Sequence, residues 1–136
     1  MTACFADAYY FFALLNPRDE AHPAAKLFSA ASRRPIVTTA WVLTEVADGL
    51  AATPSRNLFA QLFDSLRSNP NAFLVPPDAA LFERGIAPYR NRGDKSWSLT
   101  DCISFEVMRD HGLTDAFTGD HHFEQAGFVA LLKSTT

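Results

Sequence analysis

The chain has 136 residues, of which 48% are hydrophobic and 20% are charged, and its formal net charge is −3. This composition excludes a disordered chain, and the length is typical of one domain, which we expect to cover residues 1–136. The acidic balance argues against a module that binds nucleic acid by general electrostatics, because such modules are usually basic. Contact with a polyanion would therefore be local or depend on a bound cation.

Short apolar strands alternate with helical stretches along almost the whole chain. The predicted strands cover residues 3–6, 36–39, 73–75, 116–118 and 129–132. The predicted helices cover residues 8–15, 20–31, 40–52, 54–68, 78–89 and 98–111, with a polar loop at 90–97 and a short turn or helical piece at 121–125. Strands that are apolar on both faces are typical of a buried parallel sheet. The pattern predicts a three-layer α/β/α fold with a parallel sheet of about five strands.

The cysteine content and the apolar runs bear on the compartment. Cys4 and Cys102 are too few and too far apart for a disulfide framework or a zinc site, so we expect a reduced, cytoplasmic environment. The N-terminus has no basic start followed by a long apolar run, so we expect no signal peptide. No stretch approaches the roughly 18 apolar residues of a membrane span, so we expect no membrane partner.

Four acidic residues fall where an α/β sheet binds its ligands, outside the carboxyl ends of the strands. Asp7 directly follows the first predicted strand, and Asp120 follows the fourth. Glu45 lies in the first two turns of the helix after the second strand. Asp101 lies in the first turn of the helix before the fourth strand. These carboxylates can therefore converge on one edge of the sheet from separate elements.

Each of these acids also has a purely structural explanation. Glu45 could be a solvent-facing helix residue. Ser98 and Asp101 fit a capping box, and an acid in the first turn also complements the helix dipole. Asp7 and Asp120 could be turn residues at strand ends. None of the four indicates a function by itself.

As a group, the four acids favour a metal site. Carboxylates placed within a few ångströms repel one another, and a cation relieves this repulsion. Oxygen ligands without His or Cys among them favour Mg²⁺ or Mn²⁺ over zinc. Such a site can activate a water molecule and stabilise the charge that develops on a phosphodiester. A bound cation would also let an acidic pocket attract phosphate.

Five sequence blocks match a known family in order and spacing. They are residues 5–8, 38–46, 94–105, 115–123 and 125–128. With them the sequence resembles the PIN-domain family, and in particular the VapC-type toxin ribonucleases of prokaryotic toxin–antitoxin pairs. The resemblance covers nearly the whole chain and implies a parallel sheet of about five strands between helices.

The resemblance also implies an activity and roles for single residues. The activity is Mg²⁺- or Mn²⁺-dependent endonucleolytic cleavage of single-stranded or loop RNA. Asp7 and Asp101 are expected to be the most direct metal ligands, with Glu45 and Asp120 completing the site through the metal or its waters. One or more of these carboxylates would orient or deprotonate the attacking water, and the Thr118 hydroxyl would hold that water or a carboxylate. A cognate antitoxin and a homodimer are the expected partners.

Two further acids lie near the proposed site in sequence. Asp115 begins the fourth predicted strand, whereas Asp120 follows its end, so strand polarity favours Asp120. Asp94 lies in the loop before the Asp101 helix, where it could reach the pocket rim or act as a loop or capping residue.

The loop before that helix combines cations with an aromatic ring, through Arg90, Arg92, Lys95 and Trp97. It could grip phosphates and stack a base of RNA, or it could be a solvated loop with Trp97 tucked into the core. Two histidines that follow Asp120, His121 and His122, could touch substrate, although such residues are more often surface turn residues.

Other functions remain as alternatives. One is a stand-alone PIN-domain RNA-processing nuclease, and another is an inactive PIN scaffold that binds RNA or protein. A phosphatase of the haloacid-dehalogenase type would need a second Asp two residues after Asp7, where this chain has Tyr9. The chain also lacks a glycine-rich phosphate loop, which argues against nucleotide-dependent chemistry.

Overall fold

The computed structural model describes residues 2–52 and 54–133. The strands are β1 (Cys4–Ala6), β2 (Ile36–Thr39), β3 (Ala72–Val75), β4 (Asp115–Phe117) and β5 (Val129–Ala130). The helices are α1 (Ala8–Leu15), α2 (His22–Ala31), α3 (Ala40–Gly49), α4 (Arg56–Ser68), α5 (Ala79–Asn91), α6 (Leu99–Asp110) and α7 (His121–Gln125). The predicted domain limits at residues 1 and 136 lie outside the described residues.

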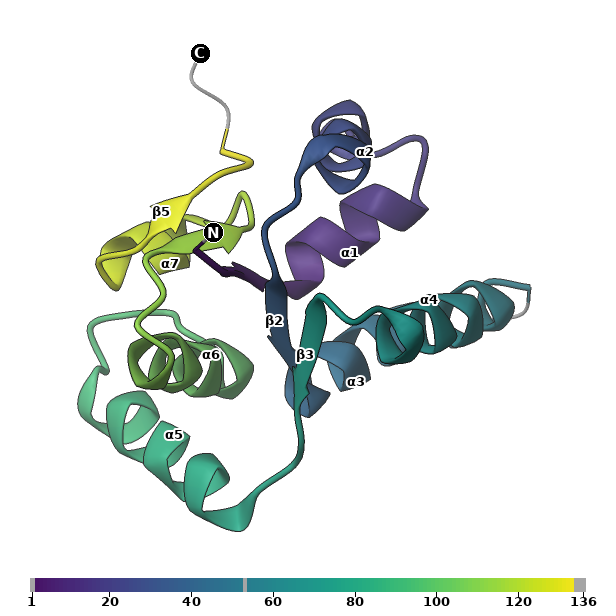
Figure 1. Cartoon of the computed structure of the whole chain (residues 1–136). Coiled ribbons are helices and arrows are strands. Elements are labelled where there is room, and N and C mark those ends of the chain that lie inside the picture. Colours follow the sequence, from purple (N-terminus) through teal and green to yellow (C-terminus); the bar gives the residue numbers. More distant parts are fainter. Residues whose placement is uncertain (1, 53, 134–136) are drawn as a thin grey trace.

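The strands form one five-stranded sheet in the order β3-β2-β1-β4-β5, and every pair of neighbours is parallel. Helices α1 to α4 lie on one side of this sheet, and α5 and α6 lie on the other (Figure 1). The predicted three-layer α/β/α fold with a parallel sheet is therefore confirmed. In the described part of the chain, no helix is long and apolar enough to span a membrane.

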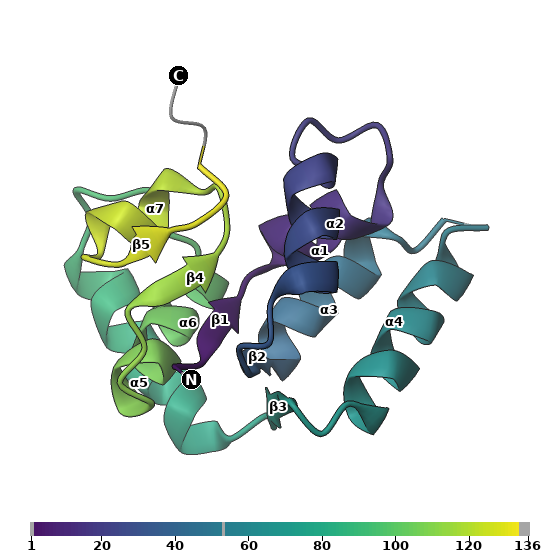
Figure 2. The same ribbon diagram turned by 45° about the horizontal axis from the view of Figure 1, so that its top comes forward.

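The strand order reverses beside β1. The chain runs from β1 outward to β2 and β3, then crosses back to place β4 on the other side of β1 (Figure 2). In open α/β sheets this reversal opens a crevice at the carboxyl ends of the two strands. Asp7 follows β1 and Thr118 follows β4, so both residues lie at the carboxyl ends of these neighbouring strands, where such a crevice is expected.

Aromatic rings fix α6 and α7 to the sheet. The Phe105 ring of α6 meets the Phe123 ring of α7 edge-on at a centroid distance of 5.0 Å. Phe123 also lies 6.2 Å from Phe5 of β1, and all three rings are buried. Aromatic pairs of this kind stabilise the fold beyond the effect of the apolar area that they bury. The two helices that carry Asp101 and Asp120 are thereby held at the exit of β1.

The predicted element boundaries are correct to within two residues, except at the end of α3, where the difference is three residues. Helix α3 ends at Gly49 rather than at residue 52. The Phe12 ring lies so close to Gly49 that a Cβ there would be 2.6 Å from Cζ of Phe12. Helix α5 continues past Pro88 to Asn91, and the Arg92 N–H bonds the Pro88 carbonyl oxygen at 3.0 Å. Strand β5 ends at residue 130 rather than at 132.

Gly85 sets the distance between α5 and α6, and its replacement tests this packing. A Cβ at Gly85 would lie 3.3 Å from the backbone Cα and N of Ile103 and would also press on the Ile103 side chain. Alanine normally stabilises a helix interior relative to glycine, by about 1 kcal/mol. Here we expect Gly85→Ala to lower the free energy of unfolding by about 1–2 kcal/mol, because overpacking outweighs that gain. Urea denaturation measures the effect.

The matched control is Gly93→Ala, since a Cβ at Gly93 would meet no atom within 4 Å. We expect this variant to stay within about 0.5 kcal/mol of the wild type. Equal stability of the two variants would show that α5 and α6 can separate without cost.

Candidate active site

Asp7 is the most buried acid of the site, with 5% of its surface exposed. Asp7 is at the N-cap position of α1, but its side chain makes no capping hydrogen bond to that helix. Instead, the Thr118 hydroxyl donates to Oδ2 of Asp7 at 2.9 Å. Burial raises the pKa of Asp7 from 3.8 to about 7, with further upward contributions from Asp101 and Glu45, while the bond from Thr118 acts in the opposite direction. The turn-residue explanation thus does not account for this side chain.

Asp101 combines a structural role with a place in the site. The Asp101 N–H donates to the Ser98 hydroxyl oxygen at 3.0 Å, and the Ser98 N–H donates to Oδ2 of Asp101 at 3.1 Å, which completes the predicted capping box. The same Oδ2 lies 3.0 Å from Nδ1 of His122. Burial raises the pKa of Asp101, although both hydrogen-bonding partners oppose this shift. The cap holds the carboxylate in place without removing it from the crevice.

Glu45 is exposed on α3, but its carboxylate lies near the other acids. Its pKa is raised, first by partial burial and then by the negative charges of Asp101 and Asp120. Glu45 is therefore exposed to solvent and also lies within the electrostatic influence of Asp101 and Asp120. Glu45 is solvent-facing, as its structural explanation predicted, and its place in a metal site remains a prediction.

Asp120 begins α7 and accepts the His122 N–H at 2.9 Å. Its own N–H donates to the Thr118 hydroxyl oxygen at 3.1 Å. That hydroxyl is fully buried and at the same time donates to Asp7. Thr118 therefore connects the ends of β1 and β4, and of the two expected partners for its hydroxyl the structure shows a carboxylate.

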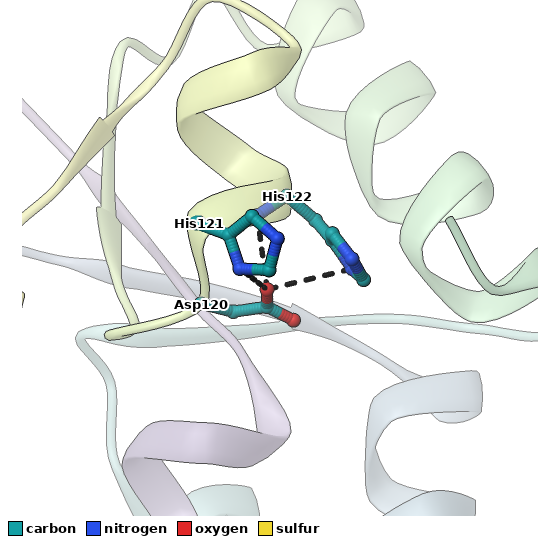
Figure 3. Close-up of side chains that lie close together, drawn as sticks. All are labelled: Asp120, His121 and His122. Atoms are coloured by element: carbon teal, nitrogen blue, oxygen red, sulfur yellow. Dashed lines mark hydrogen bonds and ion pairs between the residues drawn. The ribbon is translucent and has the colours of Figure 1, made fainter. Parts of the chain in front are cut away.

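His122 is a member of the site that the sequence analysis undervalued. Its side chain is 19% exposed, and Nδ1 lies 3.0 Å from Asp101 and 3.4 Å from Oδ1 of Asp120. His121 is 65% exposed and lies 3.7 Å from the same Asp120 oxygen. The usable ligand atoms of Asp120, His121 and His122 all lie within 4.8 Å of one another (Figure 3). The available signal was the position of His122 two residues after an acid at a strand exit, within the same turn.

The donor set fits a divalent cation. Within residues 2–52 and 54–133, no lysine or arginine forms an ion pair with Asp7, Glu45, Asp101 or Asp120. Buried carboxylates without a cationic side chain are costly unless they are protonated or bind a metal. Among these residues, no three of the four carboxylates come as close together as the Asp120–His121–His122 group.

The imidazole of His122 bears on which metal the site would prefer. Preference for Mg²⁺ or Mn²⁺ was inferred from a set of oxygen ligands with no histidine. The crevice instead contains the ring of His122, and imidazole is also a ligand for zinc and other transition metals. The carboxylates remain the larger part of the donor set, so the expectation of a hard cation rests on them alone.

Asp115 and Asp94 lie outside the site. Asp115 begins β4 and pairs with Arg34 at 2.9 Å, at the end of the strand opposite to Asp120. Asp94 is 60% exposed and pairs with Arg92 at 3.0 Å and with Lys95 at 4.0 Å. Strand polarity therefore identified the correct member of the Asp115–Asp120 pair.

The predicted RNA-binding loop begins later and is less basic than its sequence indicated. Arg90 belongs to α5, and both Arg92 and Lys95 are paired with Asp94. Trp97 is 8% exposed, and its Nε1 donates to the Gln125 side chain at 3.0 Å. Of the two alternatives for Trp97, the structure shows the one in which the ring packs into the core. Contacts of the three cations with RNA remain a prediction.

Comparison with known proteins identifies the family. The family model of the PIN domain matches residues 4–129. The chain belongs to the PIN-domain family. Its relatives include the Mycobacterium tuberculosis protein named 23S rRNA-specific endonuclease VapC20, which is 29% identical over 132 residues, or 92% of this chain and 95% of VapC20.

Two solved structures share the fold of this chain. The crystal structure of VapC20, described as a Sarcin-Ricin loop cleaving toxin, matches with a TM-score of 0.83 at 27% identity, over 93% of this chain and 97% of that chain. FitAcB from Neisseria gonorrhoeae matches with a TM-score of 0.61 at 20% identity, over 93% and 94% of the two chains. The latter likeness shows the fold alone.

The raised pKa of Asp7 predicts that the free energy of unfolding of the metal-free protein depends on pH. The folded protein holds this proton more tightly than the unfolded chain, so the contribution to stability is present below about pH 4 and is lost as the pH rises to about 7. We expect the free energy of unfolding of the wild type to fall relative to Asp7→Asn over this range, by a few kcal/mol since one pKa unit is about 1.4 kcal/mol. Urea titrations at several pH values in EDTA measure this. A constant difference between the two proteins would contradict the shift.

The Thr118 hydroxyl can be removed without changing the shape of the side chain. Thr118→Val deprives Asp7 of its donor and the Asp120 N–H of its acceptor, so we expect a loss of about 1–3 kcal/mol in unfolding free energy. The midpoint of the Asp7 titration should also move to higher pH. Thr38→Val is the control, because that buried hydroxyl donates to the Ala6 carbonyl oxygen at 2.8 Å rather than to an acid. The same titration midpoint in both variants would refute the role of Thr118.

Proposed function

We propose that this protein is a divalent-metal-dependent endoribonuclease that acts as the toxin of a toxin–antitoxin pair. The observation that carries the proposal is the gathering of Asp7, Glu45, Asp101 and Asp120 at the reversal point of a parallel sheet, with no lysine or arginine paired to them among the described residues. The similarity to VapC20, named a 23S rRNA-specific endonuclease, supports the reaction class.

The proposed cofactor is Mg²⁺ or Mn²⁺. Asp7 and Asp101 are its most direct ligands, and Glu45 and Asp120 complete the site through the metal or its waters. A bound cation of this kind lowers the pKa of water and offsets the charge that develops on a phosphodiester during hydrolysis. The raised pKa values of Asp7, Glu45 and Asp101 support this assignment, because they mark carboxylates whose charged form is disfavoured in the fold and would be stabilised by a cation.

The side chains around the carboxylates have distinct tasks in this proposal. Thr118 orients Asp7, and the capping box with Ser98 orients Asp101. His122 lies between Asp101 and Asp120 and fixes their relative position. We assign to Glu45 the role of accepting a proton from the attacking water, which is supported by its exposure and its raised pKa.

The proposed substrate is a single-stranded or loop segment of RNA. The sarcin–ricin loop of 23S rRNA is the first segment to test, because VapC20 is described as cleaving it. We further propose a cognate antitoxin as partner, a homodimeric assembly, one PIN domain over residues 1–136, and a cytoplasmic site of action, where the buried thiols of Cys4 and Cys102 would stay reduced.

Cleavage of a sarcin–ricin stem–loop by the purified protein tests the proposed activity. We expect cleavage with Mg²⁺ or Mn²⁺ and none in EDTA. Asp101→Asn should lower the rate by more than about 100-fold, since even residues that only support a metal ligand contribute about 10–100-fold. Mapping of the RNA ends by primer extension identifies the cleaved bond.

The matched control is Asp110→Asn, which removes an exposed acid from the end of α6 opposite to Asp101. It should cleave at the wild-type rate. Induction of each variant in growing cells extends the test to the toxin role, with arrest expected for the wild type and Asp110→Asn. Undiminished cleavage in EDTA, or growth arrest by Asp101→Asn equal to that by the wild type, would overturn the proposed mechanism.

A further inference from the structure

Tyr9 presents an open aromatic ring at the rim of the crevice. It lies in the first turn of α1, two residues after Asp7, and is 39% exposed, whereas the adjacent Tyr10 is 2% exposed. Tyr10 stacks on Phe117 in the core at a centroid distance of 5.1 Å. Among the described residues, the aromatic pairs do not include Tyr9. Its ring is therefore available to a planar ligand.

The backbone of Gly119 locates this ring relative to the acids. A Cβ at Gly119 would lie 2.6 Å from the Tyr9 hydroxyl oxygen and would press on the ring itself. Gly119 stands between Thr118, which binds Asp7, and Asp120. The Tyr9 ring thus lies against the segment that joins two of the proposed catalytic carboxylates. Glycine is the residue that leaves room for it.

The charges around the site favour a contact with RNA that does not depend on a positively charged side chain. The acids of the crevice repel phosphate in the absence of a cation, and the nearby cations Arg92 and Lys95 are already paired with Asp94. The aromatic ring of that loop, Trp97, is buried. Stacking of a base on an exposed aromatic ring contributes affinity without any positive charge, and every base offers a face for it.

We propose that Tyr9 is the stacking platform for an unpaired nucleobase of the RNA, next to the phosphodiester that enters the crevice. This inference rests on the proposed ribonuclease function in taking RNA as the ligand. A ring in this role would favour RNA whose bases are unpaired and can unstack from their neighbours, as in a loop or a single strand.

A fluorescent RNA tests the stacking directly. The probe is a single-stranded octamer with 2-aminopurine, whose fluorescence falls when the base stacks, and Asp101→Asn is the background that prevents cleavage. We expect Tyr9→Phe to bind and quench as Tyr9 does. Tyr9→Leu should bind about fivefold or more weakly and lose the quenching. Phe73→Leu is the matched control, since Phe73 is 54% exposed and lies beside His111, at the end of α6 remote from Asp101.

Gly119→Ala tests the same ring without changing it. The added methyl group must displace Tyr9, so RNA affinity should fall as in Tyr9→Leu. The double variant should bind no more weakly than the weaker single variant, because both changes remove one interaction. Additive losses would show that Gly119→Ala acts on Asp120 instead, and would overturn this account of Gly119.

Three results would overturn the role of Tyr9. They are unchanged binding and quenching in Tyr9→Leu, equal loss in Tyr9→Phe, and a parallel loss of Mn²⁺ affinity measured by calorimetry on Tyr9→Leu with the natural Asp101. Cleavage by the wild type combined with unchanged binding by Tyr9→Leu would refute the stacking alone. Tyr9-dependent quenching in a wild-type protein that does not cleave RNA would support the stacking and refute the ribonuclease.

Discussion

The hydrogen bond from Thr118 to Asp7 is the interaction on which the site depends. It joins residues 111 positions apart, at the exits of two neighbouring parallel strands. The same hydroxyl accepts the Asp120 N–H, so one buried side chain fixes both strand exits and the start of α7. The parallel pairing of β4 with β1 brings the two residues together, and the Asp7 N–H also donates to the Phe117 carbonyl oxygen at 3.3 Å.

Among residues 2–52 and 54–133, no lysine or arginine relieves the electrostatic repulsion between the acids of the site. Burial raises the pKa of Asp7 to about 7, and the neighbouring acids add to the effect. Hydrogen bonds from Thr118, Ser98 and His122 hold the carboxylates without neutralising them. A divalent cation can stabilise carboxylates whose charged form is disfavoured by burial and by neighbouring acids. Asp115 and Asp110, which lie away from the site, do have arginine partners.

Structural and functional explanations of a residue proved compatible here. Asp101 forms the capping box that its sequence context predicts, and it also faces His122 in the crevice. Glu45 is exposed, as the helix pattern allowed, and still interacts with Asp101 and Asp120. Trp97 shows the opposite outcome, because burial of its ring excludes the stacking role that its neighbours suggested. The exposed ring at the rim is Tyr9, whose surroundings depend on Gly119 from a distant segment.

The alternation of strands and helices, and the placement of Asp7 and Asp120 just after strands, follow from short-range apolar patterns and were therefore readable from the sequence. Asp101 was also readable, since its capping box is encoded within four residues. The tertiary structure alone decided that β1 lies between β2 and β4, that His122 points back to Asp101, and that Arg92 and Lys95 are paired with Asp94. These features depend on side-chain directions and strand order, which chain-local patterns do not specify because the contacts form between segments brought together only by folding.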